Sequence, residues 1–306
     1  PAYKMKQVPG GTVKSGMDWG LADDYPLPVS IPAFKIGETE VTYELWYAVR
    51  EWATSEERGA KYVFSNPGRE GGNGTDGAAP TAEKKTHPVT NVNWRDSVVW
   101  CNAYSEATGK TPVYYEDAAY TVVLRKSETS GEASAGKGKA EKAYIKEEAN
   151  GFRLPTEVQW EYAARGGVPG TGTPWTYTYA GSNTIDDVAW YDGNAMHPEK
   201  KKEKEKTAEA AEGKKAAGKK ERADAGAGIH PVKKKAANSL GLYDMSGNIW
   251  EWCWDKSSSD AKGKGLNRIE RGGGCGNSDH CSALTHRFDF SPVNKYNDLG
   301  VRVVCL

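Results

Sequence analysis

Hydrophobic residues recur at helical spacing in three stretches of the chain. The first stretch follows Thr42, the second begins at Asp96, which we expect to be an N-cap, and ends near Gly109, and the third runs from Thr156 to Gly166. The apolar positions of the first stretch are Leu45, Trp46, Val49 and Trp52. A period of 3.6 residues behind a capping side chain predicts three amphipathic helices.

Alternating or β-branched runs predict strands around these helices. Apolar positions alternate from Pro28 to Val41, and Tyr114 to Leu124 forms one arm of an expected hairpin that returns at Tyr144. Three tryptophans between Trp250 and Asp255 share one face if that segment is extended. The β-branched run from Leu299 to Val304 suits a buried strand. Helices early and strands late predict an α+β domain.

Two hydrophilic stretches interrupt this pattern. Residues 126–142 are mainly Ser, Gly, Glu, Ala and Lys, so we expect a long, mobile hairpin tip. Residues 199–228 are mainly Lys, Glu, Ala and Gly with both signs of charge interleaved, which predicts a disordered insertion more than a basic tether. Apart from these insertions, residues 1–306 have the size of a single irregular domain.

Composition and charge narrow the possible functions. Lys plus Arg and Asp plus Glu both number 41, so no net charge favours nucleic acid or an anionic membrane surface. Eleven Trp and sixteen Tyr stand beside 35 Gly, which is typical of a loop-rich protein more than of a helical bundle. The chain has no run of about 18 apolar residues that would span a membrane. Its five cysteines include no Cys-x-x-Cys pair, and we expect free thiols.

The segment 271–304 is the strongest candidate for function. It opens with a glycine-rich turn and closes with the expected strand. Three groups between these ends show neither helical nor strand periodicity, so we expect loops at residues 276–280, 288–290 and 296–298. Aromatic, amide and acidic side chains on loops between rigid ends are typical of recognition. An ordinary polar loop is the alternative.

Seven motifs along the chain carry a family resemblance. They are Val8 to Thr12, Gly37 to Thr42, His87 to Val89, Asn93 to Asp96, Gly151 to Gly167, Gly241 to Asp255, and Arg271 to Gly273 with Gly300 to Arg302. In this order they resemble the formylglycine-generating, sulfatase-modifying type of C-type lectin-like domain. The resemblance implies one irregular α+β fold with few regular elements.

Enzymes of this family oxidise a cysteine of a client protein with oxygen, using copper held by two cysteines. Cys275 and Cys281 lie in the corresponding region, but the positions that match the enzymes' cysteines are Gly274 and Asp279. Two soft thiolates must converge on one Cu(I) ion for that chemistry. We therefore expect no catalytic residues, and a copper-dependent cysteine oxidase is the alternative function.

The last segment also resembles the variable region of proteins diversified by retroelements, of the treponemal type. In those proteins Asn codons at fixed positions are changed into codons for many other residues. The resemblance implies a variable ligand-binding surface formed by Gly276, Asn277, Ser278, His280, Phe288, Asp289, Phe290, Tyr296, Asn297 and Asp298. We expect these side chains on one exposed face, above the fixed residues Gly272, Gly273, Arg287, Gly300 and Arg302.

This second resemblance implies a non-enzymatic, receptor-like or adhesin-like protein that binds an extracellular protein or glycan. It also implies a bacterial cell-surface or secreted location, and a chain that begins at Pro1 is compatible with a lipid-anchored mature fragment. We expect a monomer. A scaffold for one constant protein partner is a third possible function.

A structural calcium ion is the one cofactor that the family resemblance implies. It assigns the carboxylates of Asp244 and Glu251 and the carbonyls of Gly247 and Ile249 as ligands. Oxygen ligands of this kind suit calcium. The alternative is that both acids only form hydrogen bonds in the core.

Overall fold

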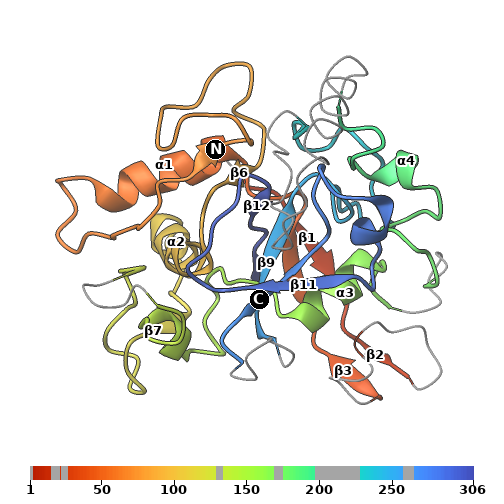
Figure 1. Ribbon diagram of the computed structural model, residues 1–306. Helices are drawn as coiled ribbons and strands as arrows, with labels where there is room; N and C mark the ends of the chain where they lie inside the picture. Colours follow the sequence, from red (N-terminus) through yellow and green to blue (C-terminus); the bar gives the residue numbers. More distant parts are fainter. Residues whose placement is uncertain are drawn as a thin grey trace.

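A four-stranded sheet occupies the middle of the molecule in the computed structural model (Figure 1). The structure describes residues 3–14, 21, 27–128, 134–168, 175–196, 228–257 and 265–306. The strand order is β11 (Arg287–Phe290), β10 (Arg268–Arg271), β9 (Trp250–Lys256) and β12 (Leu299–Gly300). β12 runs parallel to β9 and the other neighbours are antiparallel. Three of the four strands therefore come from the last 40 residues of the chain.

Four smaller sheets contain the remaining strands of the described residues. A three-stranded sheet places β4 (Phe34–Gly37) between β1 (Met5–Val8) and β13 (Val304–Cys305), so the two ends of the chain share one sheet. The two-stranded sheets are β2 (Gly11–Val13) with β3 (Val29–Ile31), β5 (Arg69–Glu70) with β6 (Val89–Thr90), and β7 (Tyr114–Tyr115) with β8 (Tyr144–Ile145). The hairpin expected from the sequence is present only in part. β7 pairs with β8, but Tyr114 to Leu124 is not a single arm, because it folds back on itself and the Leu124 backbone N–H donates to the Tyr114 carbonyl at 3.0 Å.

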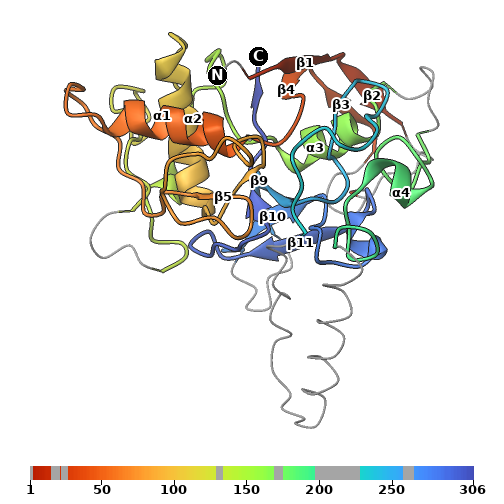
Figure 2. The ribbon, with the colours of Figure 1, turned by 90° about the horizontal axis from the view of Figure 1, so that it is seen from above.

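Helices flank the central strands on two sides (Figures 1 and 2). α1 (Tyr43–Thr54) and α2 (Trp94–Ala107) lie on one side, and α3 (Glu157–Ala164) and α4 (Ile185–Val188) lie on the other. Short 3-10 turns are η1 (Ala140–Lys142) and η3 (Asp279–Ser282). Mixed helices and small sheets of this kind confirm the expected α+β class.

The two faces of β9 bury side chains in two different cores. Trp252 joins the cluster that contains α1 and α2, where the rings of Trp46 and Trp100 stack at 5.3 Å. Cys253, the next residue, joins the cluster around Trp160 of α3. Alternation along an extended strand explains why neighbouring residues face opposite cores. The sheet is therefore held from both sides, and β10 is a rigid support for the edge strand β11.

Three local predictions were wrong. Asn93, and not Asp96, is the N-cap of α2: the Asn93 side chain accepts from the Asp96 backbone N–H at 2.8 Å, and Asp96 is the third helical residue. The run from Leu299 to Val304 forms two short strands in different sheets, not one strand. Phe288 to Phe290 belongs to β11, because pairing with β10 orders a segment too short to show a period by itself.

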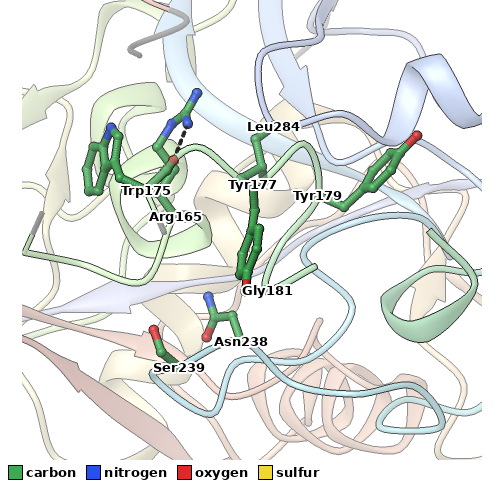
Figure 3. A pocket seen from close by; sticks show the side chains of 8 residues that line it. All are labelled: Arg165, Trp175, Tyr177, Tyr179, Gly181, Asn238, Ser239 and Leu284. Atoms are coloured by element: carbon green, nitrogen blue, oxygen red, sulfur yellow. Dashed lines mark hydrogen bonds between the residues drawn. The ribbon is translucent and has the colours of Figure 1, made fainter. Parts of the chain in front are cut away.

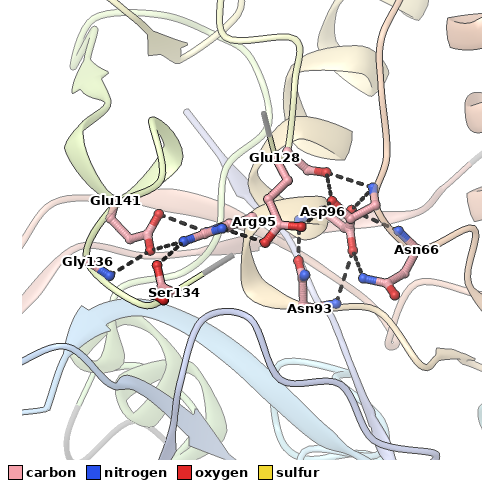
Figure 4. A network of polar contacts seen from close by, with 10 residues as sticks. Asn66, Asn93, Arg95, Asp96, Glu128, Ser134, Gly136 and Glu141 are labelled. Carbon is pink, nitrogen blue, oxygen red and sulfur yellow. Dashed lines mark hydrogen bonds and ion pairs between the residues drawn. The ribbon is translucent and has the colours of Figure 1, made fainter. Parts of the chain in front are cut away.

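The expected mobile tip at residues 126–142 is anchored where the structure describes it (Figure 4). The guanidinium of Arg95, fully buried on α2, pairs with Glu128 at 2.6 Å and with Glu141 at 2.8 Å. A buried charge requires such partners, so this insertion shields Arg95 from water. The other insertion, expected at 199–228, lies almost entirely outside the described residues, which resume at Gly228.

Candidate functional site

Arg302 fixes the C-terminal end of the segment 271–304. Its guanidinium donates to both carboxylate oxygens of Glu251, the Nε at 3.0 Å to each and the Nη2 at 2.7 Å to Oε1. It also donates to the backbone carbonyls of Gly37 and Tyr243 at 2.9 and 2.8 Å. Glu251 in addition accepts from the Trp160 indole N–H at 2.7 Å. Both charges are buried and paired, which is the condition under which a buried ion pair is tolerated.

Arg271 fixes the N-terminal end in the same way. It donates to the Glu161 carboxylate at 2.6 Å, and to the backbone carbonyls of Leu284 and His286, each at 2.7 Å. Those carbonyls lie just before β11. One buried side chain therefore holds both the start of the segment and the corner from which β11 departs.

Glu157 links this anchor to the edge strand. Its carboxylate forms an ion pair with Arg287, the first residue of β11, and lies 3.5 Å from Arg271 Nε. Burial raises the pKa of Glu157 to about 7, although the positive charges of Arg271 and Arg287 act in the opposite direction. The first residue of β11 is therefore paired with a buried acid whose pKa is near neutral.

The turn after β10 requires glycine. Gly272 and Gly273 have φ angles of 97° and 79°, a region that side chains rarely adopt. A Cβ on Gly273 would lie 2.6 Å from the backbone oxygen of Cys281. Here two parts of the segment approach so closely that only the absence of a side chain permits the contact.

An aromatic segment supports the corner at Leu284 (Figure 3). Trp175, Tyr177 and Tyr179 surround a narrow cavity together with Arg165, and the Leu284 backbone N–H donates to the carbonyl of Thr178 at 2.8 Å. The cavity has no room for a water molecule. It is therefore a packing contact for the segment and not a binding pocket.

The loop from Gly276 to His280 divides into anchored and exposed residues. The Asn277 side-chain oxygen accepts from the Trp250 indole N–H at 2.8 Å and from the Gly274 backbone N–H at 3.2 Å. Ser278 and His280 are exposed. Asn277 therefore shapes the loop, whereas the side chains of Ser278 and His280 are available to solvent.

Six rings form a continuous series across β11, which we call the aromatic chain. In order of contact, its members are His280, His286, Trp250, Phe288, Phe290 and Tyr296, with ring centroids 4.6, 5.8, 6.0, 5.2 and 4.7 Å apart. Phe288 is 46% exposed, whereas Trp250 is 2% exposed. Burial, with the charges of His280 and Arg271, lowers the pKa of His286. The aromatic chain thus contains the partly buried imidazole of His286 and rings that range from buried Trp250 to exposed Phe288.

Nine of the ten expected ligand-binding residues are at least partly exposed. These are Gly276, Asn277, Ser278, His280, Phe288, Asp289, Phe290, Tyr296 and Asn297. The prediction that Asp298 faces solvent was wrong, because Asp298 is 1% exposed and its backbone carbonyl accepts from the Trp250 backbone N–H at 2.8 Å. Parallel pairing of β12 with β9 begins at the next residue and buries this position.

Two rings outside the ten positions contact this surface. Trp250 is buried beneath it, and His286 is partly exposed beside it. No local pattern identifies them, since Trp250 lies 36 residues before His286 in the chain. The sheet register brings them together.

The two cysteines of this region differ in burial and in the apolar residues around them. Cys275 is fully buried in a small cluster with Ile249, while Cys281 is partly buried and packs against the core of α1 and α2. Among the described residues no group of three or more His, Cys, Asp and Glu side chains is arranged to hold a metal. Burial of this kind suits inert thiols better than a reactive pair.

The four predicted calcium ligands fit hydrogen bonding better than chelation. Both oxygens of Glu251 are engaged by Arg302, a cation that a calcium ion would have to displace. Asp244 accepts from the Lys233 backbone N–H at 2.8 Å, and burial raises its pKa to about 6. Calcium at these residues stays a prediction that the contacts do not favour.

Comparison with known proteins defines the class of this fold. The chain matches the family of Sulfatase-modifying factor enzyme 1-like domains over residues 1–305. It belongs to this family, which confirms the irregular C-type lectin-like architecture expected from the motifs. The longest helix among the described residues is α2 with 14 residues, and it is too short to span a bilayer.

Proteins similar to this chain include one described as a chaperone, one described as a variable protein, and CarF. A protein of Paenibacillus barcinonensis described as chaperone protein LppX is 33% identical over 280 residues, which cover 90% of this chain and 81% of that protein. The solved structure of Treponema denticola variable protein 1 matches with a TM-score of 0.65 and 28% identity, covering 99% of this chain and 95% of that one. The structure of CarF matches with a TM-score of 0.68 and 27% identity, covering 99% and 98%.

Proposed function

We propose that this protein is a non-enzymatic binding protein that displays a variable surface on a fixed lectin-like scaffold. The observation that carries this proposal is the separation between the aromatic chain and the groups that hold its backbone. Arg271 and Arg302 bind buried acids and backbone carbonyls, and neither depends on the side chains of Ser278, His280 or Phe288. Ser278, His280 and Phe288 can therefore change without removing the bonds that position this surface, whereas Asn277 cannot, because its side chain bonds to Trp250 and Gly274.

The similarity to relatives supports a binding role without chemistry. One matching structure is that of a variable protein, and one relative is described as a chaperone. The burial of Cys275 also favours binding over copper-dependent oxidation, because a thiol buried in apolar surroundings is hard to convert to the thiolate that binds Cu(I). The corresponding location is the bacterial cell surface or outside the cell, with an extracellular protein or glycan as ligand and the protein acting as a monomer.

A pair of matched libraries tests the display function without knowledge of the natural ligand. The first library randomises Ser278, His280, Phe288 and Asn297, which are exposed or partly exposed. The second library randomises four fixed positions: Gly272, Gly273, Gly300 and Arg302. Both are displayed on yeast and sorted for folded protein, then for binding to unrelated target proteins.

We expect most members of the first library to fold and some to bind, and most members of the second to be lost at the folding step. Equal survival of the two libraries would refute the separation on which the proposal rests. Retroelement diversification has its own test in the surrounding genome. We expect a reverse transcriptase gene and a near-duplicate of the codons for residues 271–304 close to this gene.

A further inference from the structure

β11 is the exposed edge of the central sheet. It is the outermost strand in the order β11, β10, β9 and β12, and in the part of the chain that the structure describes it pairs with β10 alone. None of its four residues is buried, whereas every residue of β10 and of β12, the opposite edge, is buried. Figure 2 shows β11 at the margin of the sheet, beyond β10 and β9. The outer side of β11 is therefore accessible to a partner.

The backbone of an edge strand is a template for another strand. Successive residues direct their N–H and C=O groups alternately to the two sides, so half of the backbone groups of β11 point away from β10. Among the described residues, neither Phe288 nor Asp289 has a backbone hydrogen bond outside the ladder with β10. One of these two neighbours therefore presents its N–H and C=O groups outward, where an extended peptide can bond to them.

The side chains of β11 alternate between the two faces of the sheet. Phe288 and Phe290 share one face, with ring centroids 5.2 Å apart, and Phe288 also lies 6.0 Å from Trp250. Arg287 and Asp289 lie on the opposite face, on the side of α3. Phe288 is 46% exposed. A strand added beside β11 therefore meets aromatic rings on one face and charged groups on the other.

Asp289 makes the second face selective for charge. Its carboxylate accepts from Ser257 Oγ at 2.5 Å and from Asn267 Nδ2 at 2.6 Å, and both donors are neutral. Arg287, in contrast, is already paired with the Glu157 carboxylate. A residue opposite Asp289 on an added strand would lie on the same face, with Cβ atoms about 4.5 to 5.5 Å apart. A cavity of about 150 Å³ adjoins Asp289 and gives room for a side chain there. A basic side chain is therefore favoured at this position and an acidic one is disfavoured.

We infer that β11 binds an extended segment of a protein partner as an added strand, with apolar side chains over Phe288 and Phe290 and a basic side chain opposite Asp289. The inference rests on the proposed display function and names an extended peptide as the class of ligand. Backbone pairing does not depend on side-chain identity, so this mode of binding is retained when the side chains of β11 change. The side chains then decide which peptide sequence binds.

The test uses an acetylated and amidated hexapeptide of alternating valine and lysine, titrated into the protein and followed by NMR. We expect a Kd on the order of 1 mM or tighter, and slower hydrogen exchange at the amide of Phe288 or of Asp289. Two N-methylated forms of the peptide, one methylated at the valine nitrogens and the other at the lysine nitrogens, keep every side chain. Only one of them should lose binding, by about tenfold or more, because only one set of amides faces β11.

Variants of the protein separate the contributions of the two faces. Phe288→Ala should weaken binding of the valine–lysine peptide about tenfold, because it removes the exposed ring. The corresponding valine–glutamate peptide should bind the wild type about threefold more weakly, and Asp289→Asn should abolish this preference. Tyr144→Ala removes an equally exposed ring from β8, a strand of a different sheet, and should bind like the wild type.

Three outcomes would overturn the inference: the valine–lysine peptide does not bind at about 5 mM, both N-methylated forms bind like the parent peptide, or methyl hexopyranosides bind while the peptide does not. The last outcome would indicate a glycan ligand. Each of them leaves the library experiment intact, so failure of the added strand is distinguishable from failure of the display function. The N-methylated peptides probe the wild-type protein, and melting curves show whether a variant has lost binding through unfolding.

Discussion

The anchors and the display surface of the segment 271–304 use opposite kinds of side-chain contact. Arg271 and Arg302 are fully buried and bond to acids and to backbone carbonyls of other segments. Phe288 and His280 are exposed and touch mainly other rings. Contacts of the first kind position the backbone of this surface, so exposed side chains such as Phe288 and His280 can change without removing them.

The largest expected effect comes from breaking the Arg302 anchor. In Arg302→Met the buried carboxylate of Glu251 loses its charged partner, so we expect the free energy of unfolding to fall by about 3 to 5 kcal/mol. Phe288→Ala should cost about 1 kcal/mol or less, because nearly half of that side chain is already in water. Urea unfolding measures both. Similar losses in the two variants would erase the contrast between anchor and surface.

The next effect is a pH dependence from Glu157. Its pKa in the folded protein is about 7, above its ordinary value of 4.5, so folding favours the protonated acid. The stabilisation is therefore complete below about pH 4.5 and is lost as the pH rises to 7, which amounts to about 3 kcal/mol for this shift.

Glu157→Gln should remove that contribution, because an amide does not titrate. We expect the wild type to lose more stability than the variant between pH 4.5 and 7, measured by urea unfolding at each pH. Parallel curves for the two proteins would show that the Glu157 carboxyl is not linked to folding. Since Glu157 pairs with Arg287, ligand binding at β11 should be compared at the same two pH values.

A smaller effect is expected from calcium. Arg302 already occupies the Glu251 carboxylate, so adding a chelator should change the melting temperature by less than about one degree. A clear fall that added calcium reverses would instead support the predicted ligands Asp244, Gly247, Ile249 and Glu251. Asp244→Asn serves as the control, since it should abolish such a response.

The smallest effect is expected from the partly buried thiol. Cys281→Ser should leave the melting temperature and surface binding nearly unchanged, and the wild type should neither bind Cu(I) tightly nor oxidise a cysteine peptide. Equilibrium titration with Cu(I) and mass spectrometry of the peptide provide the readouts. Copper-dependent aldehyde formation that disappears in Cys281→Ser would establish the oxidase and contradict the proposed function.

The capping residues of α1 and α3 were predicted correctly. Thr42 accepts from Leu45 N–H at 3.4 Å and Thr156 accepts from Gln159 N–H at 3.1 Å, so α1 and α3 begin where the side chains predicted. Asp96 was wrongly predicted as the N-cap of α2, because Asp is favoured both at the N-cap and within the first turn of a helix. The capping box, in which Asn93 and Asp96 bond to each other's backbone, resolves this choice.

Within the candidate site the sequence was informative about residue type and less so about orientation. Most of the aromatic and polar positions of 276–297 do reach the surface. Asp298 does not, and Asp289 is turned toward Ser257 and Asn267, because strand pairing decides the direction of each side chain. Pairing partners from distant segments are not encoded in a three-residue group.

The sequence by itself determined the family, the α+β class, the approximate positions of α1, α2 and α3, and the segment that carries the candidate surface. These follow from local periodicity, capping residues and ordered motifs, which act over a few residues. The tertiary structure alone decided that β11 is a strand, that Trp250 and His286 complete the aromatic chain, and that Arg95 binds the insertion. The physical reason is that sheet register and buried ion pairs join residues far apart in the chain, so their contacts exist only after folding brings them together.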